Sequence, residues 1–352
     1  MAANIQFDLN PQDAAFRPRG DSDFGLWDCY GFFDDGHKCI VHLYSKPVYP
    51  WVKHLSGEED NPLCSIIIVS PDGKTYASHI SYPKSEFKAS SEIPDVTMGK
   101  NRLLAKFDSS GKYDGLYLKS VGDGIGVELN YKVKVGAMRF SDREDLLTYD
   151  KPADGKYLGL FYMAVRCDIE GKLIINGKPI EVKGIGFNNY NMGNIKIPDI
   201  LSRWAYCHIY CGKYSMMIMH SVALERHRFA HSTKFALLDG GDLIVNSNNA
   251  ASYIEKYNID PVTGGPYPLI ETFNVVEGDI QVSGFMPAGM MAESSRLVDI
   301  PGFPFTKENP AFHSWQFSDV SLVINRGGKR EKATGQAVRE FGWIHKLFPW
   351  DR

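Results

Sequence analysis

The stretch YLGLFYMAVRCDIEGKLIINGKPIEVKGIGFNNYNMG, residues 157–193, decides the fold. Two long runs rich in Val, Ile, Leu, Phe and Tyr flank the polar sequence INGKP, which contains an Asn-Gly pair. Asn and Gly tolerate the positive φ angles of a tight hairpin turn, and β-branched and aromatic residues favour strands. The stretch therefore predicts two antiparallel strands, the second of which ends in GIGFNNYNMG, residues 184–193.

Similar apolar runs, separated by Gly, Asp and Pro turn signals, recur at intervals of roughly ten residues along the chain. GLWDCYGFF at residues 25–33 precedes a DDG turn and HKCIVHLY, and the same pattern restarts from Asp199 onward with ILSRWAYCHIYCGKYSMM at residues 200–217. This spacing is typical of antiparallel sandwiches and barrels. We therefore expect an all-β protein with few short helices. Its two barrel-like antiparallel domains, residues 1–195 and 196–352, would lie side by side and join around residues 184–193.

The composition of the chain narrows its class of partner. Its 352 residues suffice for two ordinary cores, and its 43% hydrophobic and 23% charged residues are usual globular values. A formal net charge of -3 leaves no excess of Lys or Arg for binding nucleic acid or a membrane surface. No apolar run reaches the ~18 residues of a membrane span, and the N-terminus lacks a secretory signal. We expect a cytoplasmic protein without a membrane span.

The six cysteines predict neither disulfides nor a metal site. They lie mostly in apolar runs, where a reduced Cys behaves as a small hydrophobic side chain. Two of them stand four residues apart in a predicted strand, about 13 Å from each other at the usual rise, which is too far for one zinc ion. The six residues are Cys29, Cys39, Cys64, Cys167, Cys207 and Cys211.

Two segments are helical candidates, NAASYIEKY at residues 249–257 and ALERHRFAH at residues 223–231. The second would bring Glu225, His227 and His231 near one another if it were helical and buried. Nothing apolar repeats on that face, which favours an exposed polar loop over a metal site.

The sequence GDGIG at residues 122–126 is superficially similar to a dinucleotide-binding fingerprint. A strand follows it, not a phosphate-capping helix, so we expect a hairpin turn. No Walker lysine motif, G-x-S-x-G elbow or H-E-x-x-H motif occurs in the sequence. We therefore expect no cofactor and no metal.

The segment GIGFNNYNMG resembles the G-x-G-Y-x-D-H-N-W-G motif of the family that contains carotenoid hydratases (hydroxyneurosporene synthases) and lipocalin-like fungal Diels-Alderases. Other patches resemble this family in the same order, and the pericyclase members are closest in kind. They are GLWDCYGFFDDG, the turn PDVTMGKN at residues 94–101, LFYMAVRCDIEGKLIINGKPIEVKG, RWAYCHIYCGKYSMM at residues 203–217 and ATGQAVREFGWI at residues 333–344. The resemblance implies two lipocalin-like antiparallel β-barrel domains that hold a small hydrophobic polyketide or terpenoid.

The segment departs from the family motif at the positions where hydratase-like members carry acidic and imidazole side chains. Asn188, Asn189, Tyr190 and Met192 stand where hydratase-like members usually carry a histidine, an aspartate, a second histidine and a tryptophan. Amides and a phenol are too weakly acidic to protonate an alkene at neutral pH, which counts against a hydratase. Acid catalysis would return if another acidic residue on the resembling segments were buried at a pocket. Those residues are Asp28, Glu92, Asp95 and Glu340.

The candidate site residues combine these patches. In residues 204–210 every second residue is aromatic or histidine, and residues two apart in a strand share a face. Candidate catalytic residues are His208, Tyr190 and Asn189. Candidate substrate-binding residues are Trp27, Tyr30, His42, Asn101, Asn191, Trp204, Tyr206 and Trp343.

The resemblance and this composition favour a pericyclase of secondary metabolism. A Diels-Alder or hetero-Diels-Alder cycloaddition needs an oriented substrate and a hydrogen-bond donor, not a nucleophile. Dehydration of a benzylic alcohol to a quinone methide could precede it. The alternatives are a terpenoid hydratase or isomerase, and a non-catalytic carrier of a lipophilic ligand. The oligomeric state stays open.

Overall fold

The computed structural model describes residues 11–47, 49, 61–139, 157–195, 197–299, 305–308 and 310–344. Regular structure in these ranges consists of strands β1–β22 and short 3₁₀ helices, which confirms the all-β prediction. The 3₁₀ helices are η1 (Pro11–Ala14), η2 (Lys84–Glu86), η3 (Ile197–Asp199) and η4 (Glu225–His227). None of the helices in the described ranges is long and apolar enough to cross a bilayer.

The hairpin that the sequence predicts is the centre of the N-terminal sheet. Strand β11 (Leu158–Ile175) pairs antiparallel with β12 (Lys178–Gly193) through a two-residue turn. The turn residues Asn176 and Gly177 have φ angles of 52° and 75°, the mirror-image turn that suits a twisted hairpin. Strand β1 (Phe24–Phe33) pairs with the other edge of β12.

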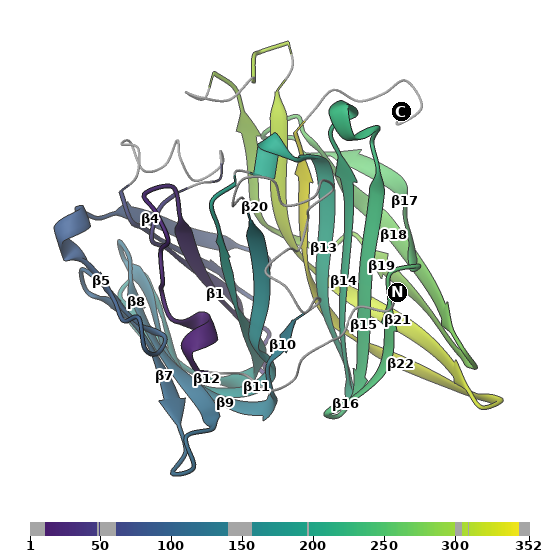
Figure 1. Cartoon of the computed structure of the whole chain (residues 1–352), viewed down its shortest axis with the longest axis horizontal. Coiled ribbons are helices and arrows are strands. Elements are labelled where there is room, and N and C mark those ends of the chain that lie inside the picture. Colours follow the sequence, from purple (N-terminus) through teal and green to yellow (C-terminus); the bar gives the residue numbers. More distant parts are fainter. Residues whose placement is uncertain are drawn as a thin grey trace. The chain divides into compact units, whose positions relative to one another are not determined.

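The chain divides into two compact units with the boundary after Ile195. The N-terminal unit is a 12-stranded antiparallel sheet in the order β4-β3-β2-β1-β12-β11-β9-β8-β7-β6-β5, and β10 also pairs with β11 (Figure 1). Its other strands are β2 (Lys38–Tyr44), β3 (Leu63–Val69), β4 (Thr75–Ser81), β5 (Phe87–Ala89), β6 (Asp95–Met98), β7 (Asn101–Phe107), β8 (Tyr113–Val121), β9 (Ile125–Val135) and β10 (Met138–Arg139). The GDGIG sequence forms the expected turn between β8 and β9.

The N-terminal sheet curls around a core built from one face of its strands. Strand β3 contacts β8 and β4 contacts β9, although neither pair is adjacent in the hydrogen-bonded order. Alternate residues such as Trp27 and Cys29 on β1 and Tyr190 on β12 belong to one buried hydrophobic cluster. The residues that alternate with these on the central strands point to the opposite face of the sheet.

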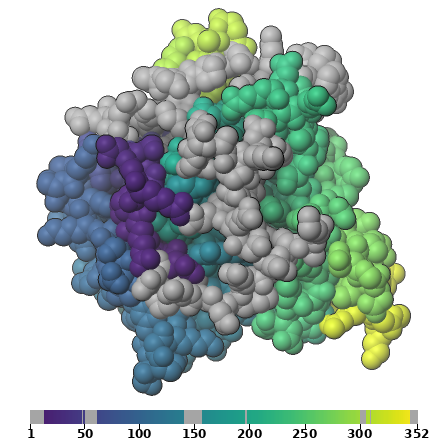
Figure 2. Space-filling view, in the orientation of Figure 1, coloured from purple at the N-terminus to yellow at the C-terminus, as the bar shows by residue number. Residues whose placement is uncertain are grey.

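The C-terminal unit is a second antiparallel sheet, with the order β16-β15-β14-β13-β22-β21-β19-β18-β17 and β20 paired with β21. It forms a half-barrel, in which β16 also contacts β18. Its strands are β13 (Leu201–Cys211), β14 (Tyr214–Ala223), β15 (His231–Asp239), β16 (Asp242–Ser247), β17 (Ala251–Ile259), β18 (Pro266–Glu277), β19 (Ile280–Pro287), β20 (Met290–Leu297), β21 (Ala311–Arg326) and β22 (Lys329–Trp343). The exposed turn between β21 and β22, in yellow, extends beyond its neighbours in this unit (Figure 2).

Both helical candidates are wrong as helices. Residues 251–259 form strand β17, because pairing with β18 outweighs the local helix preference of AASYIEKY. In the other candidate only the 3₁₀ turn Glu225–His227 is helical, and His231 already begins β15. The six cysteines are free and buried, as predicted.

Candidate active site

Side chains along β12 alternate between the two faces of the sheet, so the consecutive polar residues 188–191 point in two directions. Tyr190 points into the hydrophobic core, and Asn188 on the same side accepts a hydrogen bond from the hydroxyl of the core residue Tyr113 at 3.1 Å. Asn189 and Asn191 therefore point to the opposite face. The four consecutive polar residues form two pairs on two faces, and only the second pair meets other polar side chains of the candidate site.

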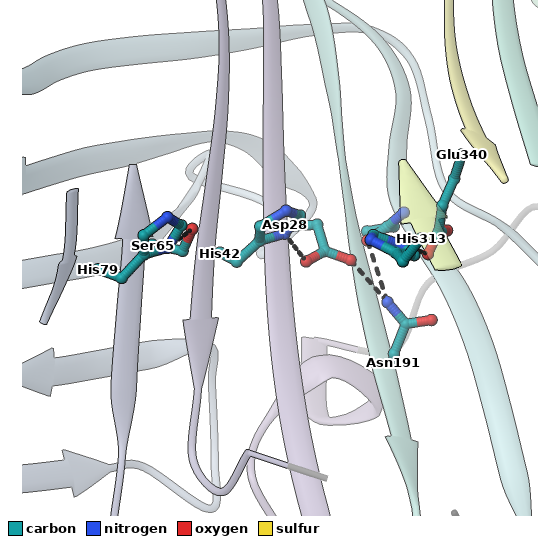
Figure 3. Close-up of polar contacts among 8 residues, drawn as sticks. Asp28, His42, Ser65, His79, Asn191, His313 and Glu340 are labelled. Atoms are coloured by element: carbon teal, nitrogen blue, oxygen red, sulfur yellow. Dashed lines mark hydrogen bonds and ion pairs between the residues drawn. The ribbon is translucent and has the colours of Figure 1, made fainter. Parts of the chain in front are cut away.

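Asp28 lies at the centre of a buried polar network on this second face (Figure 3). Its Oδ1 atom lies 2.6 Å from Nδ1 of His42, and its Oδ2 accepts a hydrogen bond from Nδ2 of Asn191 at 2.7 Å. Nδ2 of Asn191 also lies 3.4 Å from Oδ1 of Asn189. Asp28 and His42 are each 3% exposed. The two donors satisfy both carboxylate oxygens, which a carboxylate at this depth requires.

Cross-strand register explains why these residues meet. Asn189 on β12 opposes Asp28 on β1, which opposes His42 on β2, which opposes Ser65 on β3. Ser65 opposes His79 on β4, and Oγ of Ser65 lies 2.9 Å from Nδ1 of His79. Directly opposed residues share a face. These five side chains, here called the polar row, run across the sheet from buried Asn189 to half-buried His79.

Aromatic rings border the polar row on the same face. Tyr30, two residues after Asp28, stacks on Phe187 with the ring centroids 4.2 Å apart and the planes at 10°. Tyr44, two residues after His42, has its ring centroid 5.7 Å from that of His42. Both tyrosines are buried. A few convergent polar groups between aromatic walls are the usual composition of a small-molecule site.

The network determines which nitrogen of His42 can exchange a proton with a ligand. When Nδ1 of the neutral ring donates to Asp28, Nε2 is the basic nitrogen. The carboxylate also holds the ring orientation and stabilises the imidazolium that forms when Nε2 takes up a proton. The pair can therefore act as a general base and then return the proton as a general acid.

Three predicted site residues have structural contacts elsewhere in the N-terminal unit. Trp27 and Tyr190 stack on each other within the core, with ring centroids 5.0 Å apart. Asn101 holds a turn, because its Nδ2 donates to the carbonyl of Met98 at 2.9 Å and its Oδ1 accepts from the backbone N–H of Val121 at 2.8 Å. A role of these residues in the site stays a prediction.

The aromatic side of β13 faces away from the core of the C-terminal unit. Cys207 and Ile209 point into that core, and Tyr206 and His208 alternate with them. Tyr206 and His208 are nonetheless buried, at 5% and 0% exposed. The ring centroid of His208 lies 4.9 Å from that of Tyr210. The predicted shared face of this strand is therefore present, and its catalytic role stays a prediction.

A second imidazole–carboxylate pair lies on the same face of the C-terminal sheet. Nε2 of His313 on β21 is 2.9 Å from Oε1 of Glu340 on β22 (Figure 3). Glu340 opposes Tyr206 in the register of β13 and β22. His313 is not among the predicted site residues, although AFHSWQF places His313, Trp315 and Phe317 on one side of a strand.

Comparisons with known proteins agree with this architecture. Neither a family model nor a curated protein sequence matches the chain significantly. Among solved structures, CghA with Sch210972 has a TM-score of 0.68 at 12% identity over 99% of both chains. The chain therefore has a lipocalin-like fold.

Two further structures share this lipocalin-like fold. An AttH-type protein of Nitrosomonas europaea has a TM-score of 0.65 at 10% identity over 96% of this chain and 98% of its own. Kievitone hydratase of Nectria haematococca has a TM-score of 0.55 at 12% identity over 94% of this chain and 90% of its own. Identities this low establish the fold and leave the reaction to be argued from the site.

Proposed function

We propose that this protein is an enzyme that binds an apolar polyketide or terpenoid and directs it through a Diels-Alder or hetero-Diels-Alder cycloaddition after removing water from it. The observation that carries the proposal is the buried Asp28–His42–Asn191 network between the rings of Tyr30 and Tyr44. In this network the His42 imidazole can transfer a proton, the Asn191 amide can hydrogen bond, and aromatic rings surround both groups.

The Asp28–His42 pair supports the dehydration step. In an ortho-hydroxybenzyl alcohol, Nε2 of His42 would take the phenolic proton, and the imidazolium would return that proton to the departing hydroxyl group. Water leaves, a neutral ortho-quinone methide remains, and His42 ends neutral as it began. Asp28 stabilises the transient imidazolium at 2.6 Å, and such proton transfer typically contributes about 10²–10⁴-fold to a rate.

The polar row and its aromatic border support the cycloaddition step. Stacked rings such as Tyr30 and Phe187 present a flat apolar wall against which a planar diene can be held near its partner alkene. Orientation of this kind contributes up to roughly 7–11 kcal/mol in well-aligned intramolecular reactions.

A terpenoid hydratase or isomerase is the second candidate. The same Asp28–His42 pair favours it, because it supplies the carboxylate and imidazole that residues 188–192 lack. The shared fold with kievitone hydratase agrees with this candidate. Non-catalytic carriage of a lipophilic ligand requires only the apolar walls, and it leaves the buried Asp28–His42 pair without a role.

The test uses a panel of ortho-hydroxybenzyl alcohols with an electron-rich alkene such as ethyl vinyl ether. We expect the wild-type protein to form one enantiomer of the chroman, measured by chiral chromatography. His42→Gln should lose turnover from the alcohol. When light generates the quinone methide from the same alcohol, His42→Gln should still direct one enantiomer. Racemic chroman from the wild-type protein in both arms contradicts the proposal, and a hydrated product alone favours the hydratase.

A further inference from the structure

The C-terminal unit contains a cavity of about 730 Å³ that the proposed chemistry does not use. Its walls come from β13, β14, β15, β17, β18 and β22 of this unit. The lining residues that carry the argument are Arg203, His220, His231, Tyr257, Phe341 and Trp343. This volume lies within the range of small-molecule sites, roughly 300–1,000 Å³.

Strand register places the cavity at one end of the half-barrel interior. Arg203, Ala205 and Cys207 share one side of β13, and Cys207 belongs to the hydrophobic core of the unit. In the same register Arg203 opposes Trp343 and Ala205 opposes Phe341 on β22. The cavity therefore continues the core side of the sheet, and it lies on the opposite face of β13 from Tyr206 and His208.

Three rings form the apolar wall of the cavity. The ring centroid of Tyr257 lies 5.9 Å from that of Phe341 and 5.8 Å from that of Trp343, and Phe341 and Trp343 lie 5.9 Å apart. Offset and edge contacts at these distances are the preferred geometries of aromatic clusters. A flat aromatic ligand could extend this cluster without displacing a charged group.

Cationic and imidazole groups also line the cavity, beside the aromatic wall. The guanidinium of Arg203 lies 5.7 Å from the ring centroid of Trp343, and Nε2 of His220 lies 3.2 Å from Nδ1 of His231. Burial, and after it the charges of His231 and Arg203, lower the pKa of His220 from 6.5 to about 4. His220 is therefore a neutral hydrogen-bonding group near pH 7, and Arg203 supplies a positive charge at this part of the cavity.

The other charged groups near the cavity carry both signs. Lys256 and Glu255 of β17 also line the cavity and are both exposed. Ser252, which lines it too, donates to Oε1 of Glu271 at 2.9 Å, and Glu271 is paired with Arg339 at 3.0 Å. The one buried carboxylate beneath Ser252 is therefore neutralised by its own cation.

We propose that this cavity is a second ligand site, which takes an amphipathic aromatic anion. Its rings would pack on Tyr257, Phe341 and Trp343, and its carboxylate or sulfonate would accept hydrogen bonds from Arg203 and His220. The site belongs to the C-terminal unit alone, so it is independent of the polar row and of the reaction proposed there.

The test compares two probes with similar rings. The anionic probe is 8-anilinonaphthalene-1-sulfonate, and the neutral probe is N-phenyl-1-naphthylamine, which lacks the sulfonate. We expect the folded protein to bind the anionic probe, measured by its fluorescence. Arg203→Gln should weaken the anionic probe about tenfold and change the neutral probe little, since a charged hydrogen bond is lost. Lys213→Gln, which removes a cation on the exposed β13–β14 turn, is the matched control and should change neither.

Filling the cavity distinguishes probe binding at this site from probe binding at other apolar surfaces of the protein. Ile254→Trp, on the cavity wall, should fill the space and abolish binding of both probes. If that variant does not fold, Tyr257→Ser, which removes one of the three rings of the apolar wall, should weaken both probes. His42→Gln should leave both affinities unchanged, whatever its effect on turnover. The proposal is overturned if folded Arg203→Gln and cavity-wall variants bind the anionic probe as tightly as the wild-type protein.

Discussion

Asp28 and His42 oppose each other directly on β1 and β2, and Oδ1 of Asp28 lies 2.6 Å from Nδ1 of His42. In the family that the sequence resembles, the motif corresponding to residues 184–193 usually supplies the carboxylate and the imidazole. Here Asn189 occupies that strand and opposes Asp28. One face of the N-terminal sheet therefore has both groups, although neighbouring strands carry them.

Asp28→Asn tests whether this pair acts as a unit. An amide at position 28 can donate to the ring as well as accept from it, so it no longer fixes the basic nitrogen of His42. We expect turnover to fall by about 10²-fold or more while the protein stays folded. Asp95→Asn, at an exposed pair with Arg102, is the control and should keep full turnover. Unchanged steady-state kinetics in Asp28→Asn would remove the pair from the mechanism.

Gly186 on β12 tests the close packing of the strand beneath the site. A Cβ atom at this position would lie 2.0 Å from the carbonyl oxygen of Tyr30 on the paired strand. Backbone cannot move away cheaply, so we expect Gly186→Ala to reduce the free energy of unfolding by about 1–3 kcal/mol or more. Gly136→Ala, which meets nothing within 4 Å, is the control in the same unit. Equal urea midpoints for the two variants would contradict this explanation.

The fold could be predicted because its determinants are local. The Asn176–Gly177 turn, the GDGIG turn and the alternation of apolar residues each specify a hairpin without reference to distant residues. Residues 251–259 are the exception, because their strand depends on pairing with β18, which the local sequence does not encode.

The site could be predicted only in part. Residue type and local pattern predict Asn189, Asn191 and His42 individually, but their meeting at Asp28 depends on the register of three strands. The DDG turn at residues 34–36 does predict one of these contacts, because a hairpin centred there places residues 28 and 42 opposite each other. Residue type alone also favours Tyr190 as a site residue. Its ring packs in the core instead, because adjacent residues in a strand face opposite ways and Asn189 and Asn191 take the other face.

The buried pair of Glu271 and Arg339 tests electrostatics inside the C-terminal unit. Nη2 of Arg339 lies 3.0 Å from Oε2 of Glu271, and both side chains are at most 3% exposed. Glu271→Gln leaves a buried cation without its counter-charge, and we expect a loss of about 3–5 kcal/mol in unfolding free energy. The double variant Glu271→Leu/Arg339→Met should recover most of it. A double variant no more stable than Glu271→Gln would show that shape, not charge, dominates here.

The thiols provide a chemical test of the core. Burial raises the pKa of Cys39 and of Cys64 to about 12, and the other four cysteines are also buried. Thiolates react and buried thiols do not, so we expect no reaction of the native protein with Ellman's reagent at neutral pH. All six should react in guanidinium chloride. Fast reaction of one thiol in the native protein would locate an opening in the sheet that carries it.

The lowered pKa of His220 predicts how the free energy of unfolding depends on pH. Its pKa is lowered from 6.5 to about 4, first by burial and then by His231 and Arg203. In the unfolded chain the imidazole takes up a proton below its ordinary pKa of about 6.5, whereas the folded protein resists until about pH 4. The contribution of His220 is therefore fully present above about pH 6.5 and is lost as the pH falls toward 4.

His220→Gln removes this titration, so the wild-type protein should lose more stability than the variant between about pH 7 and about pH 5. Urea denaturation of both proteins at the two pH values measures the difference. Arg203→Gln should reduce the pH dependence as well, because one of the charges that opposes protonation of His220 is gone. Parallel losses of stability in the wild-type protein and in His220→Gln would mean that His220 titrates normally in the folded state.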